Sequence, residues 1–157
     1  MFFSRKSKKE EKKLALLYPE NVRVGCKADT KEKVIRALGQ MLVDSGYVDS
    51  DYVDAMVKRE ETFSTYMGAG MALPHGVEEA KKNIKASGIA VMVFPEGTDW
   101  DGETAHVAVG IAGVGEEHLQ ILSVIAEQAM EEGSMERILS GSAQEVYEIF
   151  SKDSHKE

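Results

Sequence analysis

The sequence has one cysteine and no long hydrophobic run, and these absences exclude several classes of protein. Cys26 has no partner for an internal disulfide, and a single thiolate cannot form a multi-cysteine zinc site. No stretch approaches the ~20 apolar residues that a membrane-spanning helix requires. We therefore expect a cytoplasmic protein of a reducing compartment.

Aromatic residues are also few, at 7% of the 157 residues, and basic residues are outnumbered by acidic ones. The 19 Lys and Arg against 27 Asp and Glu give a formal net charge of −8. Binding to nucleic acid phosphates needs positive charge, at least locally, so nucleic acid is not an expected partner. The apolar fraction of 43% is enough for a hydrophobic core in one folded domain.

The first 13 residues depart from this acidic composition, with six basic and two acidic residues. The apolar run that follows, 14–18, is shorter than the ~7–15 residues of a signal-peptide core and lacks a small-residue cleavage site. Phe2, Phe3 and the lysines leave open a weak contact with a membrane surface. We predict a flexible basic tail over 1–13, a domain over 14–151 and a frayed tail over 152–157.

The spacing of apolar residues predicts two helices in the first half of the chain. Asp29 or Thr30 caps the first helix, and Gly46 stops it. Its apolar face is formed by Val34, Ile35, Leu38, Met41 and Leu42. The second helix runs from about residue 49 to 61, and its buried face is predicted to hold Val53, Met56 and Val57.

Two continuous apolar runs, 88–94 and 106–112, are typical of strands buried on both faces. The segment Pro95-Glu96-Gly97 is expected to end the first strand, and 98–104 to form the loop between them. The glycines and proline of segment 68–76 predict a shaped loop or a sheet edge there instead of a regular strand.

Further helices follow the strands. A short helical turn is possible over 78–85. A long helix is predicted over 117–130, with Gly133 closing it, and a short helix over 135–140. The long helix is expected to bury Leu119, Leu122, Ile125, Ala126 and Ala129. The capping box Ser142-Ala143-Gln144-Glu145 begins the last helix. This order predicts an α/β layer architecture in which helices cover a mostly buried sheet.

The four histidines differ in their settings. His155 lies in the polar tail, and His106 begins a predicted strand, where a local hydrogen bond would account for it. His75 lies between Pro74, which fixes its own backbone angle, and Gly76, which can adopt a positive φ. Such a stiff bend could aim an imidazole at a partner, although an ordinary loop histidine remains the alternative.

His118 falls in the first turn of the predicted 117–130 helix, where free amides and the helix dipole favour an anion. If His75 meets this helix start, one nucleophilic and one donor imidazole would form a site of phosphate size. The alternative is a helix-start residue that packs against the end of a strand. Glu116 and Glu117 would repel a phosphate unless they point away or face a basic partner protein.

Other reaction classes lack their motifs. His75, His106 and His118 contain no short ligand pair for zinc, so no metal is expected. Neither a Gly-x-Ser-x-Gly nucleophile elbow nor a Walker-A loop occurs, and Gly68-Ala69-Gly70 lacks the third glycine of a dinucleotide fingerprint. No cofactor is expected, and phosphoryl exchange on histidine is the reaction that remains.

The segment Gly68 to Gly76, which ends Ala72-Leu73-Pro74-His75-Gly76, resembles the active-site motif of mannitol/fructose-type enzyme IIA. This family belongs to the bacterial phosphoenolpyruvate-dependent sugar phosphotransferase system. The resemblance extends to Phe94-Pro95-Glu96-Gly97, Val109-Gly110-Ile111-Ala112 and Glu117-His118-Leu119, and so covers roughly 22–150. The segments Phe94-Pro95-Glu96-Gly97 and Glu117-His118-Leu119 resemble the mannitol branch more than the fructose or nitrogen-regulatory branches. The implied fold is a single compact domain with a mixed β-sheet flanked by α-helices.

The resemblance also implies roles for three residues. His75 would accept a phosphoryl group from the histidine-containing phosphocarrier protein and pass it to a cysteine of enzyme IIB, with membrane enzyme IIC involved indirectly. His118 and Arg59 would support the phosphate, although Arg59, in the last turn of its predicted helix, has a structural role open to it as well. The alternative is a regulatory module in which phosphorylation of His75 switches a protein contact.

Overall fold

The computed structural model describes residues 14–151. The predictions for the basic tail 1–13, including the contact of Phe2 and Phe3, and for the tail 152–157 with His155 lie outside the described residues. In chain order the elements are η1 (Pro19–Asn21), β1 (Val22–Arg23), α2 (Lys31–Asp44), α3 (Asp51–Thr62), β2 (Tyr66–Gly68), β3 (Met71–Ala72), η2 (Glu78–Asn83), β4 (Gly88–Trp100), β5 (Glu103–Ala112), α4 (Glu117–Met130), α5 (Ser134–Ser140) and α6 (Ala143–Ser151).

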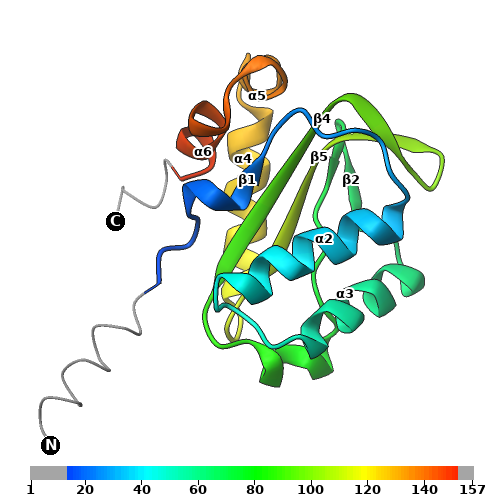
Figure 1. Ribbon diagram of the computed structural model, residues 1–157, viewed down its shortest axis with the longest axis vertical. Coiled ribbons are helices and arrows are strands. Elements are labelled where there is room, and N and C mark those ends of the chain that lie inside the picture. Colours follow the sequence, from blue (N-terminus) through cyan, green and yellow to red (C-terminus); the bar gives the residue numbers. More distant parts are fainter. Residues whose placement is uncertain (1–13, 152–157) are drawn as a thin grey trace, which may run out of the picture.

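The strands form one mixed sheet in the order β1-β4-β5-β3-β2. β1 is parallel to β4 and β3 is parallel to β5, whereas β4 with β5 and β2 with β3 are antiparallel pairs. Helices α2 and α3 cover one face of the sheet, and α4, α5 and α6 cover the other (Figure 1). The predicted fold, a mixed sheet flanked by helices in a single compact domain, is confirmed.

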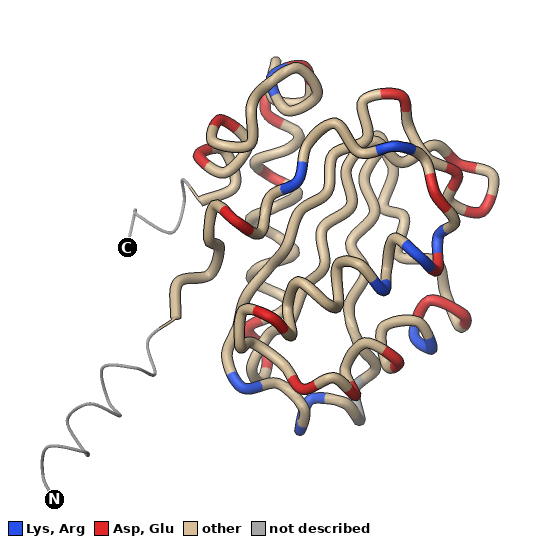
Figure 2. The backbone as a smooth tube through the Cα atoms, viewed as in Figure 1, with Lys and Arg blue, Asp and Glu red and all other residues tan. Residues whose placement is uncertain are grey.

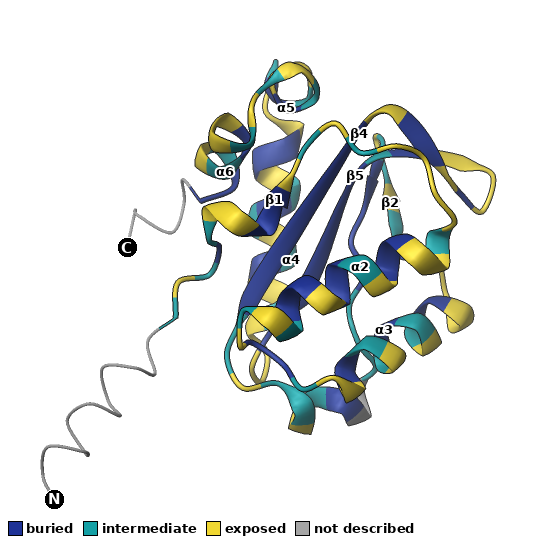
Figure 3. Ribbon diagram, in the orientation of Figure 1, coloured by how far each residue is buried: buried dark blue, intermediate teal, exposed yellow. Residues whose placement is uncertain are grey.

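The alternation of side chains along β4 builds a separate core on each face of the sheet. The residues that face α2 and α3 are Ala90, Met92 and Phe94. Branched residues face α4, α5 and α6, namely Ile89, Val91 and Val93. Figure 3 shows β4 and β5 buried along the middle of the sheet, which confirms that these strands are covered on both faces.

The helix limits agree closely with the sequence patterns, and the caps explain them. Thr30, not Asp29, is the N-cap of α2, because its hydroxyl accepts a hydrogen bond from Lys33 N at 3.3 Å. The capping box before α6 is also present: Glu145 N donates to the Ser142 hydroxyl at 3.2 Å, and Ser142 N donates to the Glu145 carboxylate at 2.7 Å. Helix α4 ends at Met130, so Gly133 does not close it and instead precedes α5.

The strand limits differ from the prediction in two places. Pro95-Glu96-Gly97 does not end β4, which continues to Trp100, because a shift of register between Val93 and Thr98 accommodates the proline. No loop over 98–104 therefore exists, and the tight turn at Asp101-Gly102 joins β4 to β5. The segment 68–76 contains the last residue of β2 and the whole of β3, which lies between β5 and β2 in the sheet.

The predicted buried faces of two helices are also partly wrong. Helix α3 buries Tyr52, Met56 and Glu60, while Val53 and Val57 are only half-buried. In α4 the residues that face the core include Ile121, Ile125 and Ala129, and Leu119 is 53% exposed.

Charge is spread over the outside of the domain. Acidic and basic positions are interspersed along the described chain in Figure 2. Among residues 14–151, no helix is long and apolar enough to cross a membrane.

Candidate functional site

The bend that carries His75 is held to the end of strand β5. Leu73 N donates to the Thr65 carbonyl at 3.0 Å, and Ile111 N donates to the Pro74 carbonyl at 2.9 Å. His75 itself forms an isolated parallel bridge with Ile111. Because the backbone on both sides of the imidazole is fixed in this way, the ring is presented from a rigid edge of the sheet.

Gly76 is required here for a different reason from the one that the sequence suggests. Its φ is not positive; instead, a Cβ at this position would lie 2.5 Å from Cε1 of Tyr52. Gly76 N donates to the Tyr52 hydroxyl at 2.8 Å, and that hydroxyl donates to the Ile111 carbonyl at 2.8 Å. Burial raises the pKa of Tyr52 to about 12, so the phenol keeps its proton and links α3, β5 and the bend.

One hydrogen bond determines which nitrogen of His75 can react. His75 Nδ1 lies 2.9 Å from the carbonyl oxygen of Leu73. A carbonyl oxygen only accepts hydrogen bonds, so Nδ1 carries the proton and Nε2 of the neutral ring keeps its lone pair. Burial lowers the pKa of His75 below its ordinary 6.5, and the positive charge of Arg59 lowers it further. The ring is therefore neutral and nucleophilic at neutral pH.

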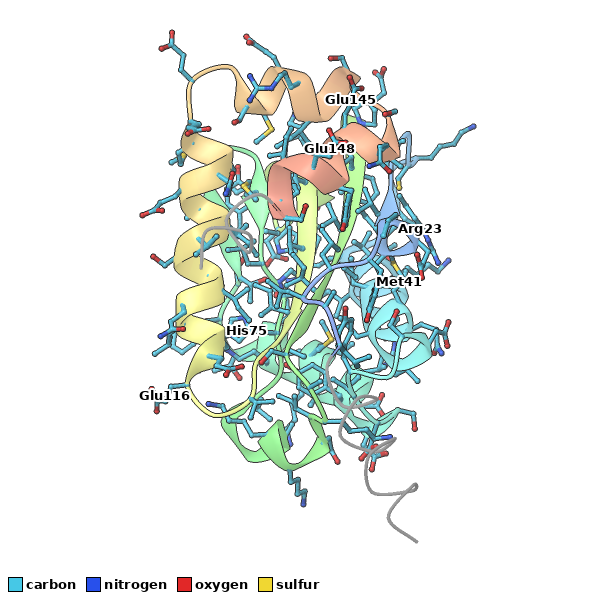
Figure 4. The ribbon with its side chains drawn as sticks, turned by 90° about the vertical axis from the view of Figure 1, so that its left-hand side faces the viewer. Arg23, Met41, His75, Glu116, Glu145 and Glu148 are labelled. Atoms are coloured by element: carbon cyan, nitrogen blue, oxygen red, sulfur yellow. The ribbon has the colours of Figure 1, made fainter. Side chains whose placement is uncertain are left out.

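The structure brings all three predicted site residues, His75, His118 and Arg59, to one cavity of about 210 Å³. The cavity is lined by Tyr52, Arg59, His75, Gly76, Val77, Lys81, Ile84, Gly113 and His118. The rings of His75 and His118 are 6.1 Å apart between centroids and tilted by 34°. Figure 4 shows His75 beside the N-terminal half of α4. A phosphoryl group is small enough for this space, and two imidazoles and a guanidinium surround it.

Arg59 has the structural role considered for it, and it also lines the cavity. It lies in the last turn of α3, where its Nη1 donates to the Phe63 carbonyl at 2.9 Å, and its guanidinium carbon is 5.8 Å from the centre of the Phe63 ring. These contacts stabilise the helix end and hold the side chain in place. A guanidinium has five N–H donors, so further donors remain for an anion in the cavity.

The two glutamates before His118 do not line the cavity. Glu116 is exposed and lies on the outer side of the chain where α4 begins (Figure 4). The carboxylate of Glu117 accepts a hydrogen bond from the Ser87 hydroxyl. The helix start also offers fewer free amides than expected, because Glu117 N and Leu119 N donate to the Val114 and Glu116 carbonyls. The donors that this end of the cavity offers are therefore mainly side chains.

Sequence reasoning missed two residues of the site. Tyr52 shares a helical face with Met56 and Glu60, and this spacing could have shown that it points into the domain. Lys81, on η2, lines the cavity; its Nζ lies 3.4 Å from His118 Nδ1 and also donates to the Gly115 carbonyl. No pattern in the sequence indicates this lysine, because its position depends on how η2 packs against the start of α4.

The remaining candidate residues lie elsewhere. His106 is inside β5, not at its start, and its Nδ1 is 3.1 Å from the Phe94 carbonyl oxygen, as a structural histidine would be. Cys26 is half-buried, and burial raises the pKa of its thiol. Over residues 14–151, no group of three or more His, Cys, Asp or Glu side chains is arranged to hold a metal ion.

A larger hollow of about 540 Å³ lies away from the histidines, over α5 and α6. It is lined by Arg137, Ser140, Gly141, Glu145, Glu148 and Ile149. It contains no imidazole, and none of its lining residues also lines the cavity at His75.

Comparison with known proteins identifies relatives over most of the chain. The family model described as "Phosphoenolpyruvate-dependent sugar phosphotransferase system, EIIA 2" matches residues 15–153. The mannitol-specific phosphotransferase enzyme IIA component of Halalkalibacterium halodurans is 50% identical over 132 residues, which cover 83% of this chain and 91% of that protein.

Two solved structures have the same fold. The crystal structure of IIA mannitol from Escherichia coli matches with a TM-score of 0.79 and 37% identity, covering 88% of this chain and 99% of the other. A complex of enzyme IIAMTL and phosphorylated enzyme IIBMTL from Escherichia coli contains a chain that matches with a TM-score of 0.81, 36% identity and the same coverage.

Proposed function

The chain belongs to the EIIA 2 family of the phosphoenolpyruvate-dependent sugar phosphotransferase system, and we propose that it carries a phosphoryl group on Nε2 of His75. The donor would be the histidine-containing phosphocarrier protein, and the acceptor a cysteine of an enzyme IIB of the mannitol type. The membrane enzyme IIC would be reached only through enzyme IIB. The proposal places the chain in the cytoplasm, where phosphoenolpyruvate is available.

The observation that carries the proposal is the hydrogen bond from His75 Nδ1 to the Leu73 carbonyl. It leaves Nε2 of a neutral imidazole as the nucleophile, in a cavity that His118 and Arg59 also line. A neutral ring is needed because a protonated imidazole has no lone pair for attack on phosphorus. The lowered pKa of His75 supports this state at neutral pH.

The first transfer exchanges one nitrogen–phosphorus bond for another. The lone pair on His75 Nε2 attacks the phosphorus atom while its bond to the donor's imidazole nitrogen breaks, and the electron pair of that bond returns to the donor. His75 Nδ1 keeps its proton on the Leu73 carbonyl throughout. In the second transfer a thiolate of enzyme IIB attacks the same phosphorus, and His75 recovers its lone pair.

Such transfers depend mainly on positioning and on charge stabilisation of the phosphoryl oxygens. The guanidinium of Arg59 can donate to two of these oxygens, and the imidazole of His118 to another. Because the transferred group must reach a second protein, these donors have to be weak enough to release it. We expect a short-lived phosphorylated form in which the cavity stabilises the phosphoryl group but leaves it accessible to the acceptor protein.

Exposed apolar side chains near the cavity support a protein partner. Phe63 is 68% exposed, Val114 44% and Leu119 53%, and each lies within four residues of a residue that lines the cavity. Apolar side chains around a polar site are typical of transient protein interfaces. The name of the Halalkalibacterium relative and the structure of the IIAMTL–IIBMTL complex support a partner from a mannitol permease.

The test is a reconstitution with phosphoenolpyruvate, enzyme I and the phosphocarrier protein, followed by addition of an enzyme IIB of the mannitol type. We expect the chain to gain one phosphoryl group and to lose it to enzyme IIB within seconds of mixing. An enzyme IIB whose active-site cysteine is replaced by serine is the control and should leave the label in place.

Two other outcomes decide against the proposal in different ways. Failure of the wild-type chain to gain a phosphoryl group contradicts the carrier function altogether. The regulatory alternative is supported by a different result. In that case the phosphoryl group stays on the chain after enzyme IIB is added, and the chain binds another protein only when it is phosphorylated.

A further inference from the structure

A second cation besides Arg59 lines the His75 cavity. Lys81 lies on η2, and its ammonium nitrogen is 3.4 Å from Nδ1 of His118 while also donating to the Gly115 carbonyl. We propose that Lys81 is a positioning residue that holds His118 with its proton on Nε2, ready to donate to the phosphoryl group. This inference rests on the proposed phosphocarrier function of His75.

The direction of the proton follows from the chemistry of the two groups. An ammonium has three N–H donors and no acceptor, so a ring nitrogen that it contacts must accept. Nδ1 of His118 is therefore unprotonated, and the proton of the neutral ring is on Nε2. Nε2 is on the opposite edge of the imidazole from Lys81, in a ring whose centre is 6.1 Å from that of His75.

Lys81 is well held for this role. Its backbone carbonyl accepts from Ile84 N at 3.1 Å, and the neighbouring Ala80 is only 5% exposed and belongs to the core. Its bond to the Gly115 carbonyl connects η2 to the loop between β5 and α4. The ammonium is thus fixed relative to His118 by both segments.

The same arrangement affects the charge of the cavity. With Lys81 and Arg59 both lining it, two cations surround a space that would receive a doubly charged phosphoryl group. A purely structural lysine would only tie η2 to the loop after β5. The two roles differ in what they do to His118: only the positioning role controls which of its nitrogens carries the proton.

The tautomer of His118 can be observed directly. Long-range ¹H–¹⁵N spectra of protein labelled with ¹⁵N-histidine distinguish a protonated from an unprotonated ring nitrogen. They would be recorded at one fixed pH for the wild type, Lys81→Met, Lys81→Arg and the control Lys82→Met. Lys82 is the exposed neighbour on η2, so its replacement removes the same charge without touching His118.

We expect His118 Nδ1 to be fully unprotonated in the wild type, in Lys81→Arg and in Lys82→Met. In Lys81→Met the signals should shift toward the average of the two tautomers, because the ammonium that requires Nδ1 to accept is gone. Phosphorylation of His75 should slow by roughly tenfold in Lys81→Met, less than the 10²–10³ typical of deleting a donor outright, and recover in Lys81→Arg.

A protonated Nδ1 in the wild type, or identical His118 signals in Lys81→Met and wild type, would overturn the inference. Equal slowing by Lys81→Met and Lys82→Met would also overturn it, since general charge would then suffice. These failures are distinct from failure of the proposed function, in which the wild type itself gains no phosphoryl group although the tautomer of His118 can still be read.

Discussion

The imidazoles of His75 and His118 lie 6.1 Å apart between ring centres, although one follows strand β3 and the other begins helix α4. The sheet is the reason for this proximity. Ile111, near the end of β5, binds the Pro74 carbonyl, and the chain turns only a few residues later into α4. The end of one central strand therefore holds both histidines at the same edge of the domain.

Replacing Arg59 by glutamine should slow phosphorylation of His75 by about 10²-fold, because an oriented charged donor is lost from the cavity. Stopped reactions with a limiting amount of phosphocarrier protein would measure the rate. Lys58→Gln is the matched control, since Lys58 is the exposed preceding residue on α3. Equal rates for Arg59→Gln and Lys58→Gln would remove Arg59 from the site.

The lowered pKa of His75 predicts a pH dependence of stability. The ring is easier to protonate in the unfolded chain, at its ordinary pKa of 6.5, than in the folded one. Its contribution to the free energy of unfolding is thus complete above about pH 6.5 and decreases as the pH falls through that value toward the folded pKa. Urea unfolding should show a steeper loss with acidification for wild type than for His75→Gln. An NMR titration of His75 with a midpoint at or above 6.5 would contradict this.

Replacing Tyr52 by phenylalanine should destabilise the domain by roughly 1–3 kcal/mol, because Gly76 N–H and the Ile111 carbonyl both lose a partner. It should also slow phosphorylation, since the bend at His75 is released. Tyr66→Phe is a suitable control. It removes a similar pair of hydrogen bonds, from Gly70 N and to the Thr104 carbonyl, far from the cavity. Slowing of the same size in both variants would mean that Tyr52 acts only through stability.

Glu60 makes a separate prediction about the fold. Its buried carboxylate accepts from Trp100 Nε1 at 3.0 Å and from the amide and hydroxyl of Thr65 at 2.8 and 2.6 Å. Glu60→Gln should cost roughly 1–3 kcal/mol, because an amide cannot accept all three. Trp100 is the single tryptophan, so its fluorescence reports both the local change and unfolding. The exposed neighbour Glu61 is the control, and an equal stability of Glu60→Gln and Glu61→Gln would refute the prediction.

The sequence predicted most of the elements because their signals are local. The helix of Val34, Ile35 and Leu38 and the capping box at Ser142 depend on residues within a few positions of each other. The strand β4 beyond Pro95 was missed because pairing with β5 compensates for the proline, and pairing is not visible in one strand.

The site could be predicted only in part for the same reason. The settings of His75 in a stiff bend and of His118 at a helix start are visible locally, and the family resemblance added Arg59. The position of Lys81 beside His118, and the need for Gly76 against the ring of Tyr52, arise from packing between distant segments. Such contacts follow from the assembled fold and have no spacing rule in the sequence.

The most direct test of the account is the intact mass of the chain after incubation with phosphoenolpyruvate, enzyme I and the phosphocarrier protein. Wild type, His75→Gln and the control His106→Gln would be compared; His106 is also half-buried with its Nδ1 at a carbonyl oxygen. We expect one added phosphoryl group on wild type and His106→Gln and none on His75→Gln. A phosphoryl group on His75→Gln, or none on the wild type, would contradict the proposal.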